Sequence, residues 1–451
     1  MGSIAFERAV MACDAVDAAL DRADALDVEG LSTVEGMQLL RRRQAWRRRL
    51  PAGEHALINE LACASGEELG GALRGVLADR LRIRRGEAAR RIAEAADLGP
   101  RRALTGEVLA ARLEHTAAGQ LAGRIGSEHV AVIRGFFTRL PGFVDEPTRA
   151  EAEQKLAAVA SRFRPDELER FAAHMELVLN PDGTFSDADR ARRRGLSVGP
   201  QGADEMSRLS GWLDPALRAG LDAVLAKWAA PGMGNPADDT ATVAGAPSRE
   251  AINADVRTTA QRNHDALAVM VRATLMSGEL GSHQGLPVSI VATVALEDLQ
   301  AKAGVARTGG GSVLPMSDVL RMAAHAYNYL LVFDDAKRCE LYRGRDSRLA
   351  TPAQRLVLYA TERGCSRPGC DVPAAWCQVH HVTDWARGGR TDIDELTLAC
   401  GPDNRLATDD GWTTRKNDKG ETVWIPPPHL DRGQRRTNAF FHPERYMTRD
   451  S

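Results

Sequence analysis

Residues that bind metal ions gather in the last fifth of this chain of 451 residues. Cys365 and Cys370 form a C-x4-C pair, and Cys400 brings a third thiol thirty residues later. Structural zinc sites take four ligands in a tetrahedron, and thiolates are among the ligands that zinc prefers. The spacing therefore favours a structural zinc ion over a set of buried free thiols. Two residues are alternatives for the fourth ligand, Asp403 at C-x2-D and Cys377.

An adjacent histidine pair, His380-His381, lies between these cysteines and follows Trp376 in an apolar run. Imidazole suits both metal binding and proton transfer, because its free pKa lies close to neutral pH. Neighbouring residues of a regular strand point to opposite faces. Both histidines can therefore serve one site only if the strand ends or twists at the pair.

The elements that would position these residues are short. Residues 376–382 predict a strand, a glycine-containing loop follows, and the apolar run 396–399 predicts a second strand. Pro402 then begins a helix, since proline is well tolerated in the first helical turn. Strand, loop, strand and helix, closed by a metal ion at the base, form a small module with little core of its own.

This order of elements resembles the His-Asn-His (HNH) endonucleases of the ββα-metal class. The resemblance is strongest from Gly344 to Trp412, in the phrases GRDSRLATPAQRLVLYATERGCSRPGCDVPAAWCQVHHVTDWARGGRTD and GW. These phrases are similar to one branch of the family, actinobacterial and phage proteins with a long helical N-terminal domain of unknown function. The segments MSRLSGWLDPALRAGL and QRNHDAL are similar to that N-terminal domain, so the resemblance covers most of the chain.

The resemblance implies a role for each residue of the site. In the family the second histidine of the strand pair is the general base that activates water against a phosphodiester, which here is His381. The first histidine, His380, would help to hold a divalent ion such as Mg²⁺ that steadies the scissile phosphate. Asn404 would be a second ligand of that ion, because related nucleases use an asparagine on this helix. DNA is the implied partner, contacted by the nearby arginines Arg387, Arg390 and Arg405.

Several positions depart from the family pattern. The family helix usually begins Cys-x-x-His-His, whereas this chain has Asp403 at the zinc position and Asn404 at the catalytic-metal position. Glu395 replaces the middle asparagine that ties the loop down, and Thr408 replaces a further histidine. His-Asn-His has thus become His-Glu-Asn. Three functions stay open: an endonuclease, a degenerate module that binds nucleic acid without cutting it, and a helical interaction protein with a zinc-bound tail.

The rest of the chain reads as mostly helical from its apolar periodicity. Residues 68–98 predict two helices separated near 83–86, an outline that helix-turn-helix proteins share with many helical bundles. The β-branched run 287–294 predicts a strand, residues 329–334 a second strand, and residues 352–362 a helix. The expected fold is mainly α: a large helical N-terminal domain with a small α+β middle section, plus a C-terminal zinc-stapled ββα-metal (HNH) module.

Composition shifts suggest where these parts begin and end. The segment 230–250 is rich in Gly, Pro, Ala and Asp, which is typical of a flexible linker. The C-terminal arginines and aromatic residues either extend a grip on nucleic acid or pack back on the module. The predicted parts are a helical domain at 1–229, a linker at 230–250, an α+β continuation at 251–350, the HNH module at 351–425 and a basic tail at 426–451.

Charge and composition bound the environment of the protein. The net charge of -2 gives no overall attraction to nucleic acid, although an uneven distribution leaves such a partner open. No window approaches the roughly 18 apolar residues of a membrane span. Clustered cysteines, odd in number, suit a reducing compartment better than disulfides. The sequence therefore predicts a cytoplasmic protein that does not contact membranes.

Overall fold

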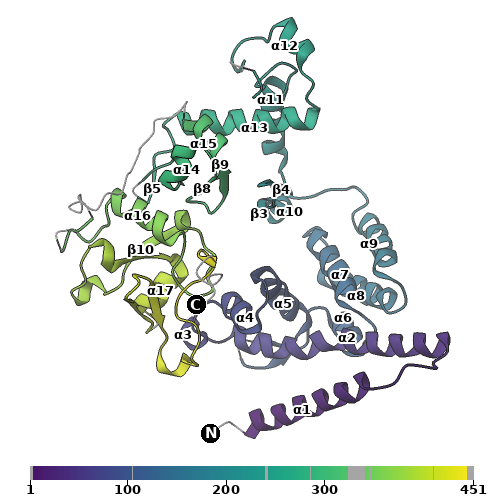
Figure 1. Ribbon diagram of the computed structural model, residues 1–451. Helices are drawn as coiled ribbons and strands as arrows, with labels where there is room; N and C mark the ends of the chain where they lie inside the picture. The colour runs from purple at the N-terminus through teal and green to yellow at the C-terminus, as the bar shows by residue number, and fades with distance from the viewer. Residues whose placement is uncertain are drawn as a thin grey trace. The chain divides into compact units, whose positions relative to one another are not determined.

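The computed structural model is mainly helical, with short two- and three-stranded sheets between helices (Figure 1). The prediction of a mainly α protein with a small α+β middle section and a ββα module is confirmed. None of the helices in the described part has an apolar stretch long enough to cross a bilayer. The predicted strand at 329–334 lies outside the described residues. These are 4–103, 105–238, 242–284, 286–323, 341–345, 347–409 and 411–443.

The chain divides into two compact units. The first comprises Met1–Asn59 and Arg91–Thr184, and the second comprises Glu60–Arg90 and Phe185–Ser451. The short segment 60–90 therefore folds with the C-terminal part of the chain, although it is far away in the sequence. The domain boundaries that composition suggested stay a prediction.

The first unit is a helical bundle. Its core lies among the last four helices, where Ile133, Phe136 and Leu156 are fully buried. Its elements are α1 (Ile4–Asp24), most of α2 (Thr33–Ala62), most of α5 (Arg85–Leu98), β1 (Arg101–Arg102), β2 (Val108–Leu109), α6 (Glu114–Leu121), α7 (Ser127–Arg139), α8 (Glu146–Ala160) and α9 (Pro165–Leu179).

The second unit begins with two short helices, α3 (Gly66–Leu69) and α4 (Leu73–Leu81). Ser65 starts α3 with a capping box, because its Oγ accepts from the Glu68 backbone N–H at 3.1 Å and the Glu68 carboxylate accepts from the Ser65 N–H at 2.8 Å. The two helices predicted within 68–98 are confirmed as α4 and α5.

The middle section combines short helices with paired strands. The single strand predicted at 287–294 was wrong, because β6 ends at Pro287 and β7 begins at Ala292. β6 pairs with β5 and β7 pairs with β8, so the two ends of this run join different sheets. The elements are α10 (Asp187–Arg193), β3 (Gly195–Gln201), β4 (Ser207–Trp212), α11 (Pro215–Trp228), α12 (Arg249–Ala254), α13 (Thr259–Met276), β5 (Ser282–His283), β6 (Leu286–Pro287), β7 (Ala292–Thr293), α14 (Leu296–Ala301), β8 (Val305–Thr308), β9 (Val313–Pro315) and α15 (Met316–Ala323).

The segment 230–250 makes specific contacts in its described residues. The indole N–H of Trp228 donates to the Val243 carbonyl at 3.0 Å, and the Gly232 N–H donates to the Asp255 carboxylate at 2.8 Å. Met233 is buried. The flexibility that composition suggested for this segment stays a prediction.

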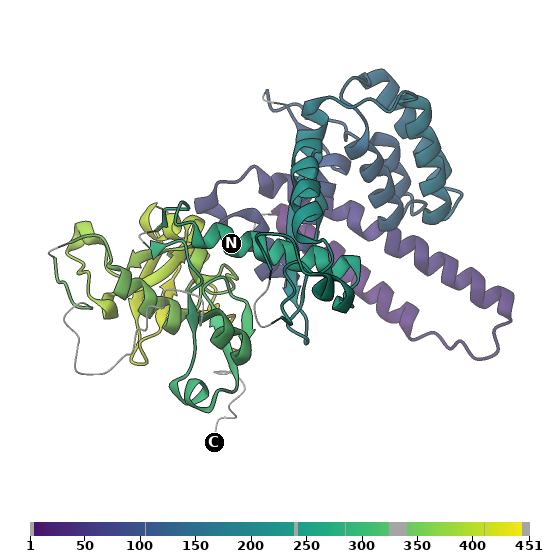
Figure 2. The same cartoon turned by 90° about the horizontal axis from the view of Figure 1, so that it is seen from above.

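The C-terminal module has the predicted ββα order, drawn in yellow-green in Figures 1 and 2. β10 and β11 pair antiparallel, with Cys377 opposite Cys400 and His381 opposite Leu396. Every residue of β11 is buried. The elements are α16 (Pro352–Glu362), η1 (Ala374–Trp376), β10 (Cys377–His381), η2 (Trp385–Arg387), η3 (Ile393–Glu395), β11 (Leu396–Cys400), α17 (Gly401–Asp409), β12 (Thr413–Lys416), β13 (Thr422–Ile425) and η4 (Pro428–Leu430).

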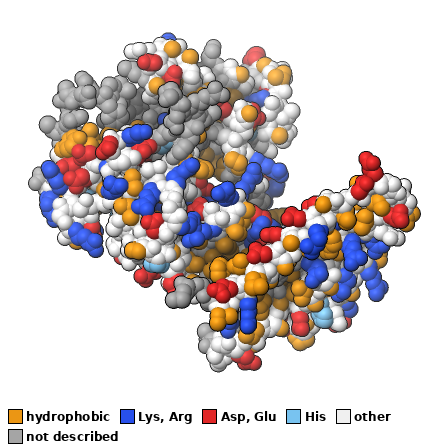
Figure 3. Space-filling model, turned by 60° about the horizontal axis from the view of Figure 1, so that its bottom comes forward, with side chains coloured by type: hydrophobic (Ala, Val, Ile, Leu, Met, Phe, Trp, Pro, Cys, Tyr) orange, Lys and Arg blue, Asp and Glu red, His pale blue; other side chains and the backbone are white. Residues whose placement is uncertain are grey.

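Charged side chains of both signs lie on the face drawn in Figure 3. Figure 3 shows lysine and arginine side chains interspersed with aspartate and glutamate on the face drawn there. This distribution agrees with the formal net charge of -2. Any attraction to a polyanion must therefore come from local groups of arginines and not from the field of the whole molecule.

Candidate active site and metal cluster

Three thiols and one carboxylate form a buried cluster at the base of the module. The ligand atoms of Cys365, Cys370, Cys400 and Asp403 all lie within 4.8 Å of one another. The Sγ atoms of Cys370 and Cys400 are 3.9 Å apart. Tetrahedral zinc with bonds of about 2.3 Å separates two sulfurs by ~3.8 Å, so this donor set fits such an ion.

Local backbone geometry brings the first two cysteines together. α16 ends at Glu362, and Arg363 follows in the left-handed conformation with φ of 62°. The Cys365 N–H then donates to the Val372 carbonyl at 2.9 Å, and the Cys370 N–H donates to the Arg367 carbonyl at 3.0 Å. These bonds fold residues 365–372 into a tight turn that presents both thiols to the same point.

The other two donors come from the junction of β11 and α17. Cys400 ends the strand, and Asp403 lies in the first turn of the helix, where it accepts from the Cys400 thiol at 3.0 Å and from the Cys365 thiol at 3.3 Å. Hydrogen bonds from Cys365 and Cys400 lower the pKa of the Cys370 thiol to about 2. Burial raises the pKa of the Asp403 carboxyl, while the positive charge of Arg367 acts in the opposite direction.

Cys377, the alternative fourth ligand, is buried beside this cluster. Its thiol donates to the backbone carbonyls of Val372 and Pro373 at 3.5 and 3.4 Å. The group of four in the described chain contains Asp403 and not Cys377. Asp403 is therefore the better placed of the two alternatives.

His380 faces the helix of the module. Its Nδ1 lies 2.7 Å from Oδ1 of Asn404, and the Asn404 amide donates to the Gln378 side chain at 2.7 Å. The ring stacks on Trp424 with a centroid distance of 6.3 Å. Burial lowers the pKa of His380 below its ordinary value, although the bond with Asn404 raises it. One nitrogen and one amide oxygen facing each other at this distance fit two neighbouring ligands of a divalent ion.

His381 faces the loop between the two strands. β10 ends at His381, as the use of both histidines required. Its Nε2 lies 3.1 Å from Oγ1 of Thr391, and its ring lies 5.6 Å from that of Trp385. The Arg345 guanidinium covers Trp385 at 4.4 Å. Burial lowers the pKa of His381, and the neighbouring His380 and the positive charge of Arg348 act in the same direction, while Asp384 raises it; the lowered pKa favours the neutral ring.

The hydrogen bonds of Thr391 assign the tautomer of neutral His381. A threonine hydroxyl has one proton to donate. Thr391 Oγ1 donates it to the Ser347 carbonyl at 2.5 Å, since a carbonyl oxygen can only accept. The His381 Nε2 must therefore carry the proton in its bond to Thr391. Its Nδ1 retains a lone pair, which is what a general base needs.

A buried glutamine holds Thr391 in place. The Gln354 side chain donates to the Thr391 carbonyl at 2.7 Å and to the Leu341 carbonyl at 2.8 Å. Gln354 is fully buried and also forms the capping box of α16 with Thr351. Sequence reasoning gave no role to Gln354, Thr391 or Ser347, because residues 37 and 44 positions apart meet here only through the fold.

The other residues singled out in the sequence lie around this loop. The Glu395 carboxylate accepts from the Arg390 N–H at 3.1 Å, which closes the loop. Glu395 thus holds the loop by a hydrogen bond, which is the role of the asparagine at this position in the family. The Arg390 guanidinium pairs with Asp392 at 2.8 Å. Arg387 and Arg405 are exposed at the surface of the module.

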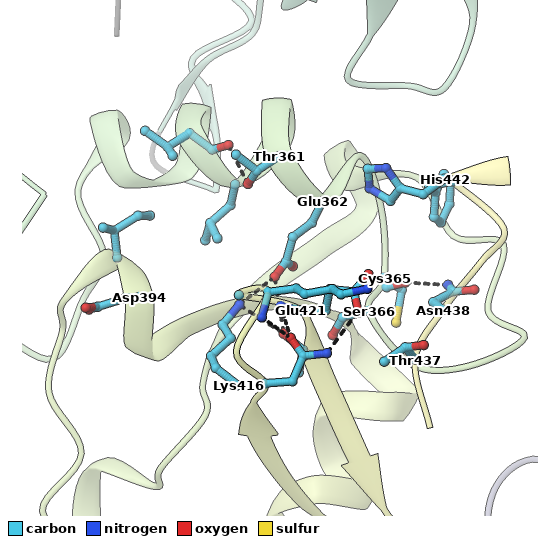
Figure 4. A pocket seen from close by; sticks show the side chains of 18 of the residues that line it. Thr361, Glu362, Cys365, Ser366, Asp394, Lys416, Glu421, Thr437, Asn438 and His442 are labelled. Atoms are coloured by element: carbon cyan, nitrogen blue, oxygen red, sulfur yellow. Dashed lines mark hydrogen bonds and ion pairs between the residues drawn. The ribbon is translucent and has the colours of Figure 1, made fainter. Parts of the chain in front are cut away.

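A cavity of about 540 Å³ lies beside α16, β12 and β13, apart from the two histidines (Figure 4). Figure 4 shows Glu362 and Lys416 pointing toward each other, and their ion pair is 3.0 Å long. The same carboxylate accepts from the Thr397 hydroxyl at 2.9 Å and from the Leu398 N–H at 2.6 Å. With these bonds Glu362 stabilises the module, since it connects α16 to β11 and β12.

The described part of the C-terminal tail packs on the module. The Asn438 amide donates to the carbonyls of Cys365 and Cys370 at 2.7 and 2.8 Å. The Arg363 guanidinium donates to the Phe441 carbonyl at 3.1 Å. These contacts favour the second alternative for the tail up to residue 443. The tail residues Arg445, Tyr446 and Arg449 lie outside the described residues.

Comparison with known proteins places the chain in a family. The family model "HNH endonuclease" matches residues 363–410, and the model "Domain of unknown function (DUF222)" matches residues 37–361. The chain therefore belongs to the DUF222 family and carries a C-terminal HNH module, as the resemblance in the sequence predicted. An HNH module indicates a nuclease or nucleic-acid-binding role in general.

Relatives at high identity cover almost the whole chain. An uncharacterized protein of Mycobacterium tuberculosis is 54% identical over 448 residues, which are 99% of this chain and 98% of the relative. A second one from the same species is 55% identical over 437 residues, 97% and 96% of the two chains. One from Mycobacterium bovis is 54% identical over 437 residues, with the same coverage. No solved structure matches this chain.

Proposed function

We propose that this protein is a metal-dependent HNH endonuclease that hydrolyses phosphodiester bonds of DNA, with His381 as the general base. The observation that carries the proposal is the chain of bonds from His381 Nε2 to Thr391 and on to the Ser347 carbonyl. This chain fixes the ring and leaves Nδ1 able to take a proton from water. In the proposed reaction the oxygen of that water attacks phosphorus as its proton moves to Nδ1. The ester bond between phosphorus and the leaving oxygen breaks, and the leaving oxygen takes a proton from solvent water.

His380 and Asn404 are the proposed ligands of a divalent ion such as Mg²⁺. A bound ion would offset negative charge on the phosphate and the leaving oxygen. Binding requires that His380 Nδ1 gives up its proton and its bond to Asn404 Oδ1, so that both atoms turn their lone pairs to the ion. Glu395 completes the proposed catalytic set by holding the loop through its bond to Arg390.

We also propose that Cys365, Cys370, Cys400 and Asp403 hold a structural Zn²⁺. The distances between the donors support zinc, and thiolate-rich sets select it over magnesium. Three arginines on the surface of the module are the proposed contacts to the DNA backbone, because guanidinium groups bind phosphate bidentately. They are Arg387, Arg390 and Arg405. A cytoplasmic location is part of this proposal.

A second candidate function is binding of nucleic acid without cleavage. The observation that favours it is the bond of 2.7 Å between His380 Nδ1 and Asn404 Oδ1, which satisfies both groups without a metal ion. A histidine at position 404 would bring a second imidazole, whereas an asparagine brings a weaker neutral ligand. In this alternative the module retains its zinc and its fold.

Nicking of supercoiled plasmid DNA separates the two functions. The parent protein is incubated with Mg²⁺, Mn²⁺ or Ni²⁺ beside His381→Ala and a matched control, His429→Ala, which removes an exposed imidazole of the same module. We expect nicking by the parent and the control and none by His381→Ala. A parent that does not nick DNA with any of the three metal ions but retards DNA in a gel would support the alternative. A parent that neither nicks nor retards DNA would exclude both functions.

A further inference from the structure

The segment that contains α3 and α4 packs tightly on the C-terminal module (Figure 1). Gly70 and Gly71 join the two helices with φ of 78° and 144°. A Cβ on Gly70 would lie 2.8 Å from a methyl group of Leu430 and 3.6 Å from Trp412, and the φ of 78° at Gly70 itself favours glycine. On the opposite side, a Cβ on Gly369 would lie 2.5 Å from Asp79 of α4.

Arg367 connects this segment to the metal cluster. One of its guanidinium nitrogens donates to the Gly70 carbonyl at 2.7 Å, and another pairs with Asp403 at 3.3 Å. The guanidinium also covers Trp412 at 5.1 Å. The Arg367 and Asp403 side chains are 11% and 8% exposed, so their ion pair is shielded from water. One side chain therefore touches both the docked segment and a proposed metal ligand.

Arg85 makes the reverse connection, from the first residue of α5 to the turn between Cys365 and Cys370. Its guanidinium pairs with Asp371 at 2.7 Å and donates to the Gly369 carbonyl at 3.0 Å. Gly369 and Arg367 thus lie between two proposed metal ligands and also contact the segment from α3 to Arg85.

We propose that metal loading of the Cys365, Cys370, Cys400 and Asp403 cluster and docking of residues 66–85 on the module stabilise each other. The inference rests on the proposed metal cluster. A bound ion would close the turn 365–370 at both ends and so fix the surface that Gly70, Asp79 and Arg85 contact.

Charge supports the same coupling. Three thiolates, one carboxylate and one divalent cation carry a formal charge of about -2 when the cluster is loaded. Arg367 places a positive charge against Asp403. Arg85 places another beside Cys370, partly offset by its pair with Asp371. Coupling between two equilibria is reciprocal. If docking of the segment increases the affinity of the cluster for zinc, then zinc binding stabilises the docked segment by the same free energy. Mutation of a residue that contacts a metal ligand commonly lowers metal affinity by about 10- to 100-fold.

The first test uses a residue outside the module. Zinc affinity of the full-length chain is measured by competition with a chromogenic chelator for the parent, Arg85→Ala and Arg84→Ala. Arg84 is exposed and adjacent in the sequence, which makes it the matched control. We expect Arg85→Ala to weaken zinc binding about tenfold and Arg84→Ala to leave it unchanged. Equal affinity of the parent and Arg85→Ala would overturn the coupling.

The second test reads the docked segment itself. Amide hydrogen exchange of residues 66–81 is followed by mass spectrometry in the zinc-loaded chain and after zinc removal by a chelator. We expect zinc removal to accelerate exchange in α3 and α4 while α7 and α8, in the first unit, stay protected. Arg367→Ala should accelerate exchange in α3 and α4 even with zinc bound.

The two tests separate this inference from the proposals on which it rests. A chain that binds no zinc overturns the cluster and the coupling together. A chain that binds zinc but whose residues 66–81 exchange equally with and without it overturns the coupling alone. Plasmid nicking by the parent is measured independently and decides the nuclease proposal in either case.

Discussion

The Nε2 atom of His381 lies 3.1 Å from the Oγ1 atom of Thr391, whose only proton goes to the carbonyl of Ser347. The direction of this chain of bonds is fixed at its far end, because a carbonyl cannot donate. Gln354 holds the backbone of Thr391 from the buried side. A residue without any ionisable group thus sets which nitrogen of His381 is free to act.

Replacement of Thr391 tests whether its hydroxyl fixes the tautomer of His381. We expect Thr391→Val to lower the rate of plasmid nicking by about tenfold or more, because it removes the acceptor for His381 Nε2–H. A correctly positioned general base accelerates such a reaction ~10²–10⁴-fold. Thr391→Ser retains the hydroxyl and should retain activity. The ¹⁵N chemical shifts of His381 should report the Nε2–H tautomer in the parent and a mixture in Thr391→Val. An unchanged tautomer would contradict the assignment.

Asn404 should respond to the chemistry of its replacement. We expect Asn404→Ala to lower nicking by about tenfold or more, because it removes a proposed metal ligand. Asn404→His restores the residue that the family usually has and should retain or increase activity. Thr408→Ala, one turn further along α17, is the control and should leave activity unchanged, since its hydroxyl donates to the backbone carbonyl of Asn404 and not to the Asn404 side chain. If Asn404→Ala cuts as well as the parent, Asn404 holds no catalytic metal ion.

The metal cluster predicts which cysteine matters. We expect about one zinc ion per chain by elemental analysis, lost in Cys365→Ser and Asp403→Ala but retained in Cys377→Ser. The reason is that Cys377 bonds to two backbone carbonyls while Asp403 lies among the three thiols. Loss of zinc should also lower the thermal unfolding midpoint. Zinc loss in Cys377→Ser but not in Asp403→Ala would reverse the assignment of the fourth ligand.

A buried ion pair in the middle section should give the protein a measurable acid sensitivity. The Asp255 carboxylate, with a fully buried side chain, bonds to the Arg257 guanidinium at 2.8 Å, and Arg257 also pairs with Asp265. Hydrogen bonds from Arg257 hold the pKa of Asp255 well below its usual range, in spite of its burial. We expect Asp255→Asn to destabilise the second unit by about 2 kcal/mol at pH 7, because the buried Arg257 guanidinium loses one of its two carboxylate partners.

The sign of the pH dependence follows from the lowered pKa. A carboxyl whose folded pKa lies below its unfolded value of about 3.9 stabilises the fold fully above that pH. The difference in stability between the parent and Asp255→Asn should therefore shrink as pH falls below about 4, measured by thermal unfolding. Asp222→Asn is the control, because its pair with Arg218 is exposed to water and contributes little to stability. A difference that is constant down to pH 2 would contradict the prediction.

Local signals were enough to predict most elements of the module. Thr351-Pro352 started α16, the apolar runs gave β10 and β11, and Pro402 lies in the first turn of α17. The prediction of one strand at 287–294 was wrong, and the reason cannot be read from the local sequence. Its β-branched residues favour a strand, but its two ends pair with different partners, and pairing partners are chosen by the whole sheet.

The sequence by itself determined the family, the ββα order and the residue types of the site, because motif spacing and apolar periodicity are local properties. Only the tertiary structure decided that Asp403 and not Cys377 joins the three cysteines, and that Thr391 supports His381. It also decided that residues 60–90 fold with the C-terminal part of the chain. Each of these depends on contacts between residues far apart in sequence, and packing and hydrogen-bond satisfaction select such contacts only when the whole chain is folded.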